Sequence, residues 1–460
     1  MNGDLKNIAP QKLAELDRTI AMFNPDEPPE WYDGTKIDEI AFSEYFLSLH
    51  PMKCIHDRLY DIDGMVQEER IRKELLDEVK PYLTTNVAKN VNRILEAVKL
   101  FAFSEELAIQ EDRIHLRNGT YFLTDRRFDA RKEFCMNRLP VKYNSAAAPP
   151  DRWLAFLNEL LYPEDIPTLQ EFMGYALIPT NKGQKMMLIV GNGGEGKSRI
   201  GRVLRALLGD NMSTFSIQKL SCDRFAKADL DGQLLLLDDD MKMDALTETN
   251  VLKTVITMED KIDLERKGKQ SVQGFLYCRI IAFGNGSLSA LYDRSDGFYR
   301  RQIGLQVREK TKGRVDDTSL GEKLIAESEG ILLWCLEGLH RLIGNGYSFT
   351  ISDRTRRNME ENQRADNNMM EFYEAETYIR FEPNTYATTR QIFSAYERWC
   401  QDNVEKPLAE KTFTTQLKKD ANRLGIRYDK NLDAGNGKRA RGYHGIHVMI
   451  RTDDGWQRNR

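Results

Sequence analysis

The stretch GNGGEGKS at residues 191–198 constrains the fold of this chain more than any other feature. It fits the pattern G-x-x-x-x-G-K-[ST] and lies between an apolar run, MMLIV, and a segment with helical periodicity, SRIGRVLRALLG. A buried strand, a glycine-rich turn and an amphipathic helix in this order form a loop whose backbone N–H groups surround phosphate at the positive end of the helix dipole. The sequence therefore predicts an α/β domain with a phosphate-binding loop.

Each position of this loop has an expected role. Lys197 is predicted to reach the β- and γ-phosphates of ATP, and Ser198 to ligate Mg²⁺. A glycine loop arising by chance is the alternative, and the strand and helix on either side argue against it. The residues predicted to bind the nucleotide are Gly191, Asn192, Gly193, Gly194, Glu195, Gly196, Lys197 and Ser198.

A second strand with acidic residues at its end supports the loop. Leu234 to Leu237 form an apolar run that leads directly into three aspartates, Asp238, Asp239 and Asp240. A buried strand followed by acids is the pattern in which one carboxylate holds Mg²⁺ and another positions the attacking water. We predict Asp238 for the metal and Asp239 for the water, with Asp240 able to replace either, because the register is ambiguous by one residue.

Further along the chain, a third strand, FLYCRIIAFGN, ends in Asn285, whose amide could sense the γ-phosphate. Arg300 and Arg301 follow, just before another apolar strand. Either arginine could reach the nucleotide of a neighbouring subunit. An exposed arginine pair without a catalytic role is the alternative.

The segment KIDLERKGKQSVQGF, residues 261–275, predicts a β-hairpin with a cationic tip. Arg266, Lys267 and Lys269 gather around Gly268. In a ring of subunits, such tips would project into a common channel and contact a phosphate backbone. A solvated turn is the alternative reading.

The net charge conceals an asymmetry along the chain. The formal charge is −4 over 460 residues, but residues 386–451 hold 13 Lys and Arg against 7 Asp and Glu, which gives +6 there and −10 elsewhere. Positive charge concentrated at one end indicates binding to a polyanion, although a solvated basic surface would look the same.

The order of elements in this basic segment is helix, turn, helix, then two strands around a Gly-rich turn, which is typical of a winged helix-turn-helix. The second helix could enter a DNA groove while the wing touches phosphates. Some winged helices bind proteins instead, and the positive charge favours DNA. The predicted DNA contacts are Lys418, Lys419 and Arg423 on the helix and Lys438, Arg439 and Arg441 on the wing.

Composition excludes several classes of protein. No apolar run approaches the roughly 18 residues of a membrane helix, and no secretory h-region follows Met1. Six widely spaced cysteines fit reduced thiols in a cytosolic protein. His50, Cys54 and His56 lie close together, but no second ligand cluster matches them, so a zinc site is not predicted.

Taken together, the P-loop, acidic strand, basic hairpin, Asn-tipped strand and paired arginines resemble the superfamily 3 helicases, which are ring-forming AAA+ motors. The stretches IHDRLYDIDG, RNGTYFL, FMGYALIPTNKGQKMMLIVGNGGEGKS and ESEGILLWCLEGLHRL are similar to the phage/plasmid primase-helicase family, which is related to the poxvirus primase-helicase. The resemblance spans roughly residues 40 to 450.

This resemblance implies a motor that uses ATP and Mg²⁺. It places Lys197 and Ser198 in the Walker A pair, the three aspartates at Walker B, Asn285 at the sensor and Arg301 or Arg300 at the arginine finger. The all-Asp triplet departs from relatives that place a Glu there. Only residues 1–36 precede the family-like region, so primer synthesis is not expected.

Five segments follow from these patterns. We expect an arm and linker at 1–36, whose role stays open, and a mainly helical domain at 37–150 that includes a hairpin at 114–123 turning at Asn118-Gly119. The AAA+ core is expected at 151–312, a helical segment and linker at 313–375, and the winged-helix domain at 376–460.

The leading hypothesis is an ATP-dependent DNA helicase that replicates a phage, plasmid or mobile island in the cytoplasm of a bacterial host. It would act as a ring, with a hexamer expected, on single-stranded and forked DNA, 3′ to 5′ by the family pattern, and work with a separate primase or loader. The alternative is an ATP-regulated initiator that assembles on DNA and melts it without processive unwinding. A P-loop kinase would explain neither the hairpin nor the basic tail.

Overall fold

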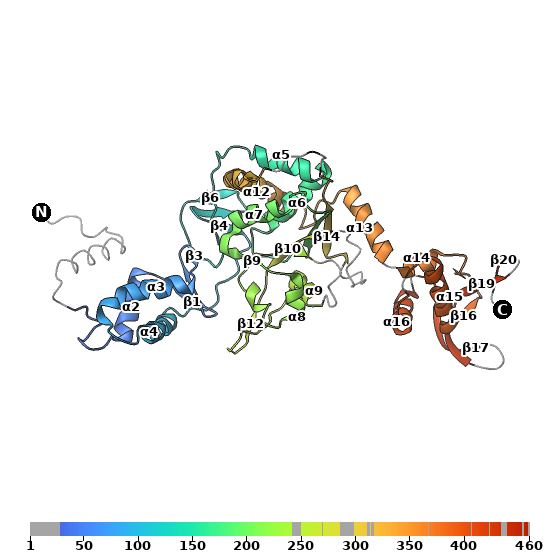
Figure 1. The fold of residues 1–460 in the computed structure, drawn as a ribbon, viewed down its shortest axis with the longest axis horizontal. Coiled ribbons are helices and arrows are strands. Elements are labelled where there is room, and N and C mark those ends of the chain that lie inside the picture. The colour runs from blue at the N-terminus through green and yellow to red at the C-terminus, as the bar shows by residue number, and fades with distance from the viewer. Residues whose placement is uncertain are drawn as a thin grey trace. The chain divides into compact units, whose positions relative to one another are not determined.

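The computed structural model shows a mixed α/β protein that divides into two compact units, residues 1–286 with 300–355 and residues 287–299 with 356–460 (Figure 1). Residues 1–27, most of the predicted N-terminal arm, lie outside the described part of the chain. The structure describes residues 28–241, 250–268, 270–285, 299–310, 313, 317–366, 368–405, 407–422, 424–433, 439–452 and 455–458.

The larger unit begins with a small helical subdomain that has its own hydrophobic core. Phe42, Phe46, Ile71, Leu75 and Ile94 are fully buried there, at helical spacing on three helices. Its elements are α2 (Glu39–Leu49), β1 (Lys53–Ile55), β2 (Arg58–Asp61), β3 (Gly64–Met65), α3 (Glu68–Val79), η1 (Lys80–Tyr82) and α4 (Val87–Phe101).

A four-stranded sheet in the order β6-β5-β4-β7 follows. The expected hairpin is present, but Leu116 pairs with Gly119, so the turn is Arg117-Asn118, one residue earlier than predicted. Ile114, Leu116 and Tyr121 pack into the same core as the residues that follow 150, so this core extends across the expected boundary there. The strands are β4 (Arg113–Leu116), β5 (Gly119–Phe122), β6 (Arg127–Asp129) and β7 (Arg138–Leu139).

The centre of the unit is a five-stranded parallel sheet in the order β14-β8-β13-β10-β9. Its strands β8, β10 and β13 are almost continuously buried, as strands covered by helices on both faces must be. Figure 1 shows α5, α6, α7 and α12 on one side of this sheet and α8 and α9 on the other. The strands are β8 (Met186–Gly191), β9 (Met212–Thr214), β10 (Leu235–Met241), β13 (Arg279–Asn285) and β14 (Gln302–Gln306).

Helices α6 and α12 pack closely, and Gly174 and Gly338 make this possible. A Cβ built at Gly174 would come within 2.4 Å of the Cys335 carbonyl oxygen. The helix that sequence places after the ATPase core therefore shares that core. The helical elements are α5 (Asp151–Leu160), η2 (Pro163–Asp165), α6 (Ile166–Tyr175), α7 (Ser198–Leu208), η3 (Gly209–Asn211), α8 (Ile217–Cys222), η4 (Ala228–Leu230), α9 (Asn250–Thr257), α11 (Leu320–Ile325) and α12 (Ser328–Gly344).

The smaller unit has a separate core built around α15 (Thr389–Asp402). A capping box between Thr388 and Gln391 starts this helix, and its apolar face buries Ile392, Tyr396 and Trp399. The remaining elements are α13 (Asp353–Asp366), α14 (Asn368–Glu374), β15 (Ile379–Arg380), β16 (Tyr386–Thr388), α16 (Glu410–Asp420), β17 (Arg427–Asp433), β18 (Arg439–His444), β19 (His447–Thr452) and β20 (Gly455–Arg458).

The smaller unit contains two three-stranded sheets, β16-β18-β17 and β15-β19-β20. Strands β17 and β18 pair antiparallel on either side of residues 434–438, where the sequence predicts two strands around a basic turn. In neither unit is any described helix long and apolar enough to cross a membrane.

Candidate phosphate-binding site

The predicted phosphate loop connects the end of β8 to the start of α7, so its backbone N–H groups lie at the N-terminus of an 11-residue helix. Gly193, Gly194 and Gly196 have φ angles of 102°, 80° and 114°. Residues other than glycine rarely adopt these φ angles, so the loop conformation requires glycine at all three positions.

Parallel pairing places Asn285 beside the loop, although 88 positions separate it from Lys197. Strand β13 runs alongside β8 with Asn285 opposite Gly191. The amide oxygen Oδ1 of Asn285 lies 3.2 Å from Lys197 Nζ. Polar groups at the carboxyl ends of adjacent parallel strands are brought together in this way, and ligands bind at that edge of such sheets.

A pocket of about 690 Å³ lies at the carboxyl ends of these strands. The loop forms one wall, and Asp239, Asp240 and Asn285 contribute polar groups. Phe156 and Leu320 add apolar surface. N–H donors, an ammonium, a hydroxyl and several carboxylates, including those of Glu159 and Asp317, form a set of groups that suits a polyphosphate accompanied by a divalent cation.

The three aspartates do not play equivalent parts, and their geometry corrects the expected assignment. Asp238 is buried, and its Oδ2 accepts the Ile217 backbone N–H at 2.7 Å. It therefore caps the start of α8 instead of lining the pocket. Asp239 and Asp240 are exposed and line the pocket. A register shift in β10 after Asp238 turns consecutive carboxylates in different directions.

Burial also shifts the pKa of the Asp238 carboxyl upward. Desolvation raises the pKa of its carboxyl, and the neighbouring charges of Asp240 and Asp239 raise it further, against the lowering effect of the Ile217 N–H. Among the described residues, neither Asp239 nor Asp240 forms an ion pair. These two carboxylates are therefore available to a cation in the pocket.

Lys197 and Glu195 form a buried ion pair inside the loop. Lys197 Nζ lies 2.9 Å from Glu195 Oε2, and both side chains are less than one-tenth exposed. Burial opposes ionisation of Glu195, but the hydrogen bond and charge of Lys197 outweigh it and hold the pKa of this carboxyl below its ordinary value. Sequence reasoning gave Glu195 no role beyond membership of the loop.

The predicted arginines lie at the amino-terminal ends of the parallel strands, whereas the loop follows the carboxyl end of β8. Arg301 immediately precedes β14, and its carbonyl accepts the Met186 N–H at 2.8 Å at the start of β8. Arg300 is exposed, and its carbonyl accepts from Lys185. Since β8 and β14 are parallel, both arginines are separated from their own phosphate loop by the length of a strand.

The predicted basic hairpin is present, but its basic residues differ in their contacts with the rest of the protein. Strands β11 (Ile262–Leu264) and β12 (Val272–Gly274) pair antiparallel, and Lys267 is exposed at the tip. Arg266 is expected as a cation at the hairpin tip, but it pairs within the protein. Its guanidinium lies 2.8 Å from Asp231 Oδ2 and also donates to the His56 carbonyl. Lys269 lies outside the described residues.

Asp231 is the shared acceptor at the base of this hairpin. His56 Nδ1 lies 3.3 Å from Asp231 Oδ2, and this hydrogen bond raises the pKa of His56. No described residues form a cluster of His, Cys, Asp and Glu suited to a metal.

In the smaller unit, several predicted DNA contacts are described. Lys418 on α16 is exposed, with its ammonium 5.7 Å from the Tyr428 ring centre. Arg439 and Arg441 alternate on β18 and are both exposed. Arg423, Lys438 and the side chain of Lys419 lie outside the described residues.

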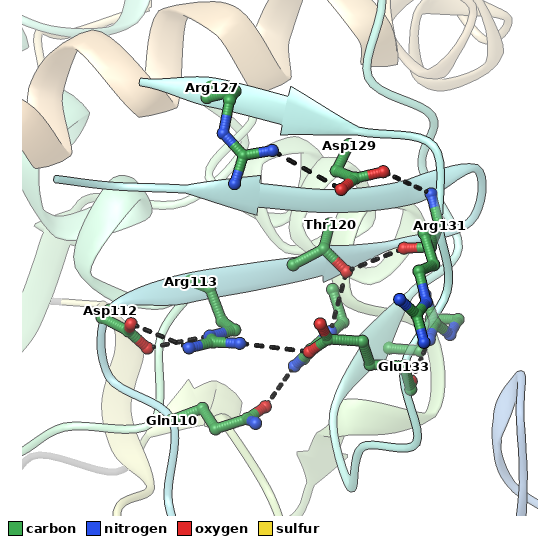
Figure 2. Close-up of polar contacts among 10 residues, drawn as sticks. Gln110, Asp112, Arg113, Thr120, Arg127, Asp129, Arg131 and Glu133 are labelled. Atoms are coloured by element: carbon green, nitrogen blue, oxygen red, sulfur yellow. Dashed lines mark hydrogen bonds and ion pairs between the residues drawn. The ribbon is translucent and has the colours of Figure 1, made fainter. Parts of the chain in front are cut away.

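A second polar group, here called the sheet cluster, lies on strands β4 to β7 and the loops between them (Figure 2). Arg113 pairs with Asp112 at 3.0 Å and with Glu133 at 3.1 Å. Buried His115 lies 2.5 Å from Gln110 Oε1 and 3.3 Å from Thr120 Oγ1. Its members are Gln110, Asp112, Arg113, His115, Thr120, Arg127, Asp129, Arg131, Glu133 and Arg138.

Comparisons with known proteins match two parts of the chain. Residues 29–161 match a family described as D5 N terminal like, and residues 189–301 match a family of unknown function, DUF5906. The first match covers the helical subdomain and the sheet cluster, and the second begins in β8 and ends just before β14. No curated protein matches the chain.

Among solved structures, apo structures of the NrS-1 C-terminal region are similar to this chain. The A form has 13% identity and a TM-score of 0.48, with 86% of this chain and 95% of that chain covered. A second structure of the region has 11% identity and a TM-score of 0.47, with 86% and 96% covered.

Proposed function

We propose that this protein is an ATP-dependent DNA helicase of the superfamily 3, AAA+ type that acts in replication. The observation that carries the proposal is the meeting of Lys197, Ser198, Asn285, Asp239 and Asp240 around one pocket of about 690 Å³. These residues come from three separate segments of the chain, and the phosphate loop motif alone does not require them to meet. The D5 N-terminal-like match at residues 29–161 supports a primase-helicase type of replication protein.

In the proposed reaction, MgATP binds with its phosphates on the loop and against Lys197. Ser198 and Asp239 would hold the metal ion, which would neutralise charge on the phosphates, and Asp240 would orient the water for in-line attack on the γ-phosphate. Asn285, which contacts Lys197 at 3.2 Å, holds the ammonium toward the phosphates. Asp238 supports the site by fixing α8 and does not touch the nucleotide.

The position of the arginines supports a ring. Arg300 and Arg301 lie at the amino-terminal ends of the strands, a strand length from their own loop, so we assign either one as an arginine finger for the nucleotide of another subunit. A closed ring with repeated head-to-tail contacts meets this requirement. We propose a homo-oligomeric ring, with a hexamer as the expected form.

DNA contacts are assigned to two places. Lys267, exposed at the hairpin tip, would track the backbone of one strand within the ring. In the smaller unit, α15, α16 and the β17–β18 pair follow the order of a winged helix. Lys418, Arg439 and Arg441 are its exposed cations for phosphate contacts.

Strand displacement on two forked duplexes tests this proposal, one with only a 3′ tail and one with only a 5′ tail. We expect ATP-dependent displacement of the 3′-tailed substrate. Lys197→Ala should lower ATP hydrolysis by roughly 100-fold or more, because it removes the cation that stabilises charge in the transition state. Displacement by this variant at the wild-type rate would contradict the proposal.

A different result would favour the initiator. ATP hydrolysis that depends on Lys197, is not stimulated by single-stranded DNA and displaces neither substrate would indicate ATP-regulated assembly and local melting. In that case a separate loader or primase would be the partner to seek.

A further inference from the structure

The phosphate loop contains an acid at its centre, and that acid is turned inward. Glu195 stands between two glycines, and it is only 3% exposed, although the flanking Gly194 is exposed. The other groups of the loop are neutral or cationic. A carboxylate in a loop built to receive phosphate is therefore a feature that needs a separate account.

The carboxylate makes contacts at both of its oxygens. Oε1 accepts the backbone N–H of Asn192 at 2.5 Å, and Oε2 lies 2.9 Å from Lys197 Nζ. The first glycine of the loop makes room for it, because a Cβ built at Gly191 would lie 2.8 Å from Glu195 Oε1. Glu195 thus occupies a fitted position on the inner side of the loop.

These contacts use the cation that a nucleotide needs. Lys197 is 7% exposed, and its ammonium lies between Glu195 and Asn285 Oδ1, which is 3.2 Å away. A triphosphate that binds the Lys197 ammonium must weaken the pairing of that ammonium with Glu195. The triphosphate also brings negative charge close to the Glu195 carboxylate. Close like charges that are shielded from water oppose binding.

We propose that Glu195 sets the nucleotide affinity of this site by acting as an internal anion that competes with phosphate for Lys197. This inference rests on the proposed function. In the nucleotide-free protein, Glu195 compensates the buried ammonium, and in the bound protein phosphate takes over that part. The residue weakens the binding of phosphate-containing ligands, and the nucleoside part is unaffected.

Replacing Glu195 by glutamine removes the charge of the side chain but keeps its size and shape. Glu195→Gln keeps the length and the acceptor for the Asn192 N–H but leaves the Lys197 ammonium without its buried counterion. Phosphate then restores a partner to an otherwise uncompensated charge, which is costly to leave alone. We expect Glu195→Gln to bind nucleotide roughly tenfold more tightly than the wild type. This factor lies within the range typical of coupling between two partners that compete for one group, here Glu195 and phosphate competing for Lys197.

Calorimetric titration of the full chain with two probes, Mg²⁺–ATPγS and inorganic pyrophosphate, tests the proposal. Both should bind Glu195→Gln more tightly than the wild type, because the competition concerns phosphate. Glu69→Gln, which removes one exposed carboxylate on α3, is the matched control for net charge and should bind like the wild type. Glu195→Asp keeps the charge and should not bind more tightly.

Equal or weaker binding of both probes by a folded Glu195→Gln would overturn the proposal, since Glu195 would then position Lys197 for the nucleotide. If that variant does not fold, Glu195→Thr takes its place with the same expectation. Lys197→Ala identifies the other failure. If wild type and Lys197→Ala bind the probes equally, the loop is not a nucleotide site, and the proposed function and this inference both fail.

Discussion

The phosphate loop and the sheet cluster both gather charged side chains in the larger unit, but they distribute their charges differently. In the sheet cluster, Arg113 lies between two carboxylates and pairs with both oxygens of Asp112 and with one oxygen of Glu133 (Figure 2). At the loop, Asp239 and Asp240 face an open pocket. Polar groups that satisfy one another stabilise a fold, whereas groups left facing a cavity can bind a ligand.

The same contrast separates residues that are neighbours in sequence. Asp238 accepts a hydrogen bond from the Ile217 N–H and belongs with the structural group, while Asp239 and Asp240 belong with the ligand-facing group. Burial and direction, and not residue type, decide the role of each carboxylate. The predictions below test this division.

The largest expected effect concerns these aspartates. Asp239→Asn and Asp240→Asn should each lower ATP hydrolysis at least roughly tenfold, because each removes a charge that faces the metal or the attacking water. Asp238→Asn should keep hydrolysis within about threefold of the wild type, because an amide oxygen can still accept the Ile217 N–H. Steady-state hydrolysis at saturating Mg²⁺ measures all three.

Thermal melts of the three variants provide the control, since only folded protein should be compared. A loss of hydrolysis in Asp238→Asn as large as in the other two would remove the structural assignment. It would restore the metal-binding role that the sequence pattern predicts for Asp238.

The next prediction concerns a loss of folding stability that leaves the phosphate site intact. Arg138 is buried and donates to the carbonyls of Ile62, Leu116 and Glu133 at 2.8, 2.8 and 2.6 Å. Arg138→Met should lower the free energy of unfolding by about 3–4 kcal/mol, because three carbonyls, one of them fully buried, lose a charged donor. Urea denaturation measures this loss.

Hydrolysis per folded molecule of Arg138→Met should stay at the wild-type level at low temperature. A strong loss of hydrolysis in the folded variant would show that the sheet cluster is coupled to the phosphate site. The division between the two groups would then not hold.

The smallest effect is the pH dependence of the sheet cluster. Burial lowers the pKa of His115 to about 4, and the nearby charge of Arg138 adds to this. Because the folded-state pKa lies below the ordinary value of 6.5, the neutral ring stabilises the fold fully above pH 6.5. This contribution is lost as the pH falls from 6.5 toward 4.

The contribution of His115 amounts to about 1–3 kcal/mol, given the size of the pKa shift. Urea midpoints measured between pH 7 and 4 should fall more steeply for the wild type than for His115→Gln. Parallel curves for the two proteins would mean that His115 does not carry this dependence.

The sequence alone determined the features that depend on neighbours along the chain. The loop between β8 and α7, the hairpin β11–β12, the β4–β5 pair and the capped helix α15 all follow from spacing, glycines and apolar periodicity over a few residues. The meeting of Asn285 with the loop was also predictable, because the carboxyl ends of parallel strands share one edge of a sheet.

Only the tertiary structure decided which of several equivalent side chains faces the pocket. Three consecutive aspartates are identical in sequence, and a shift in β10 separates them. Arg266 resembles Lys267 as a hairpin cation until Asp231, 35 positions away, pairs with it. The inward turn of Glu195 depends on the space at Gly191 and on Lys197. These outcomes depend on burial and on partners distant in sequence, which local patterns do not encode.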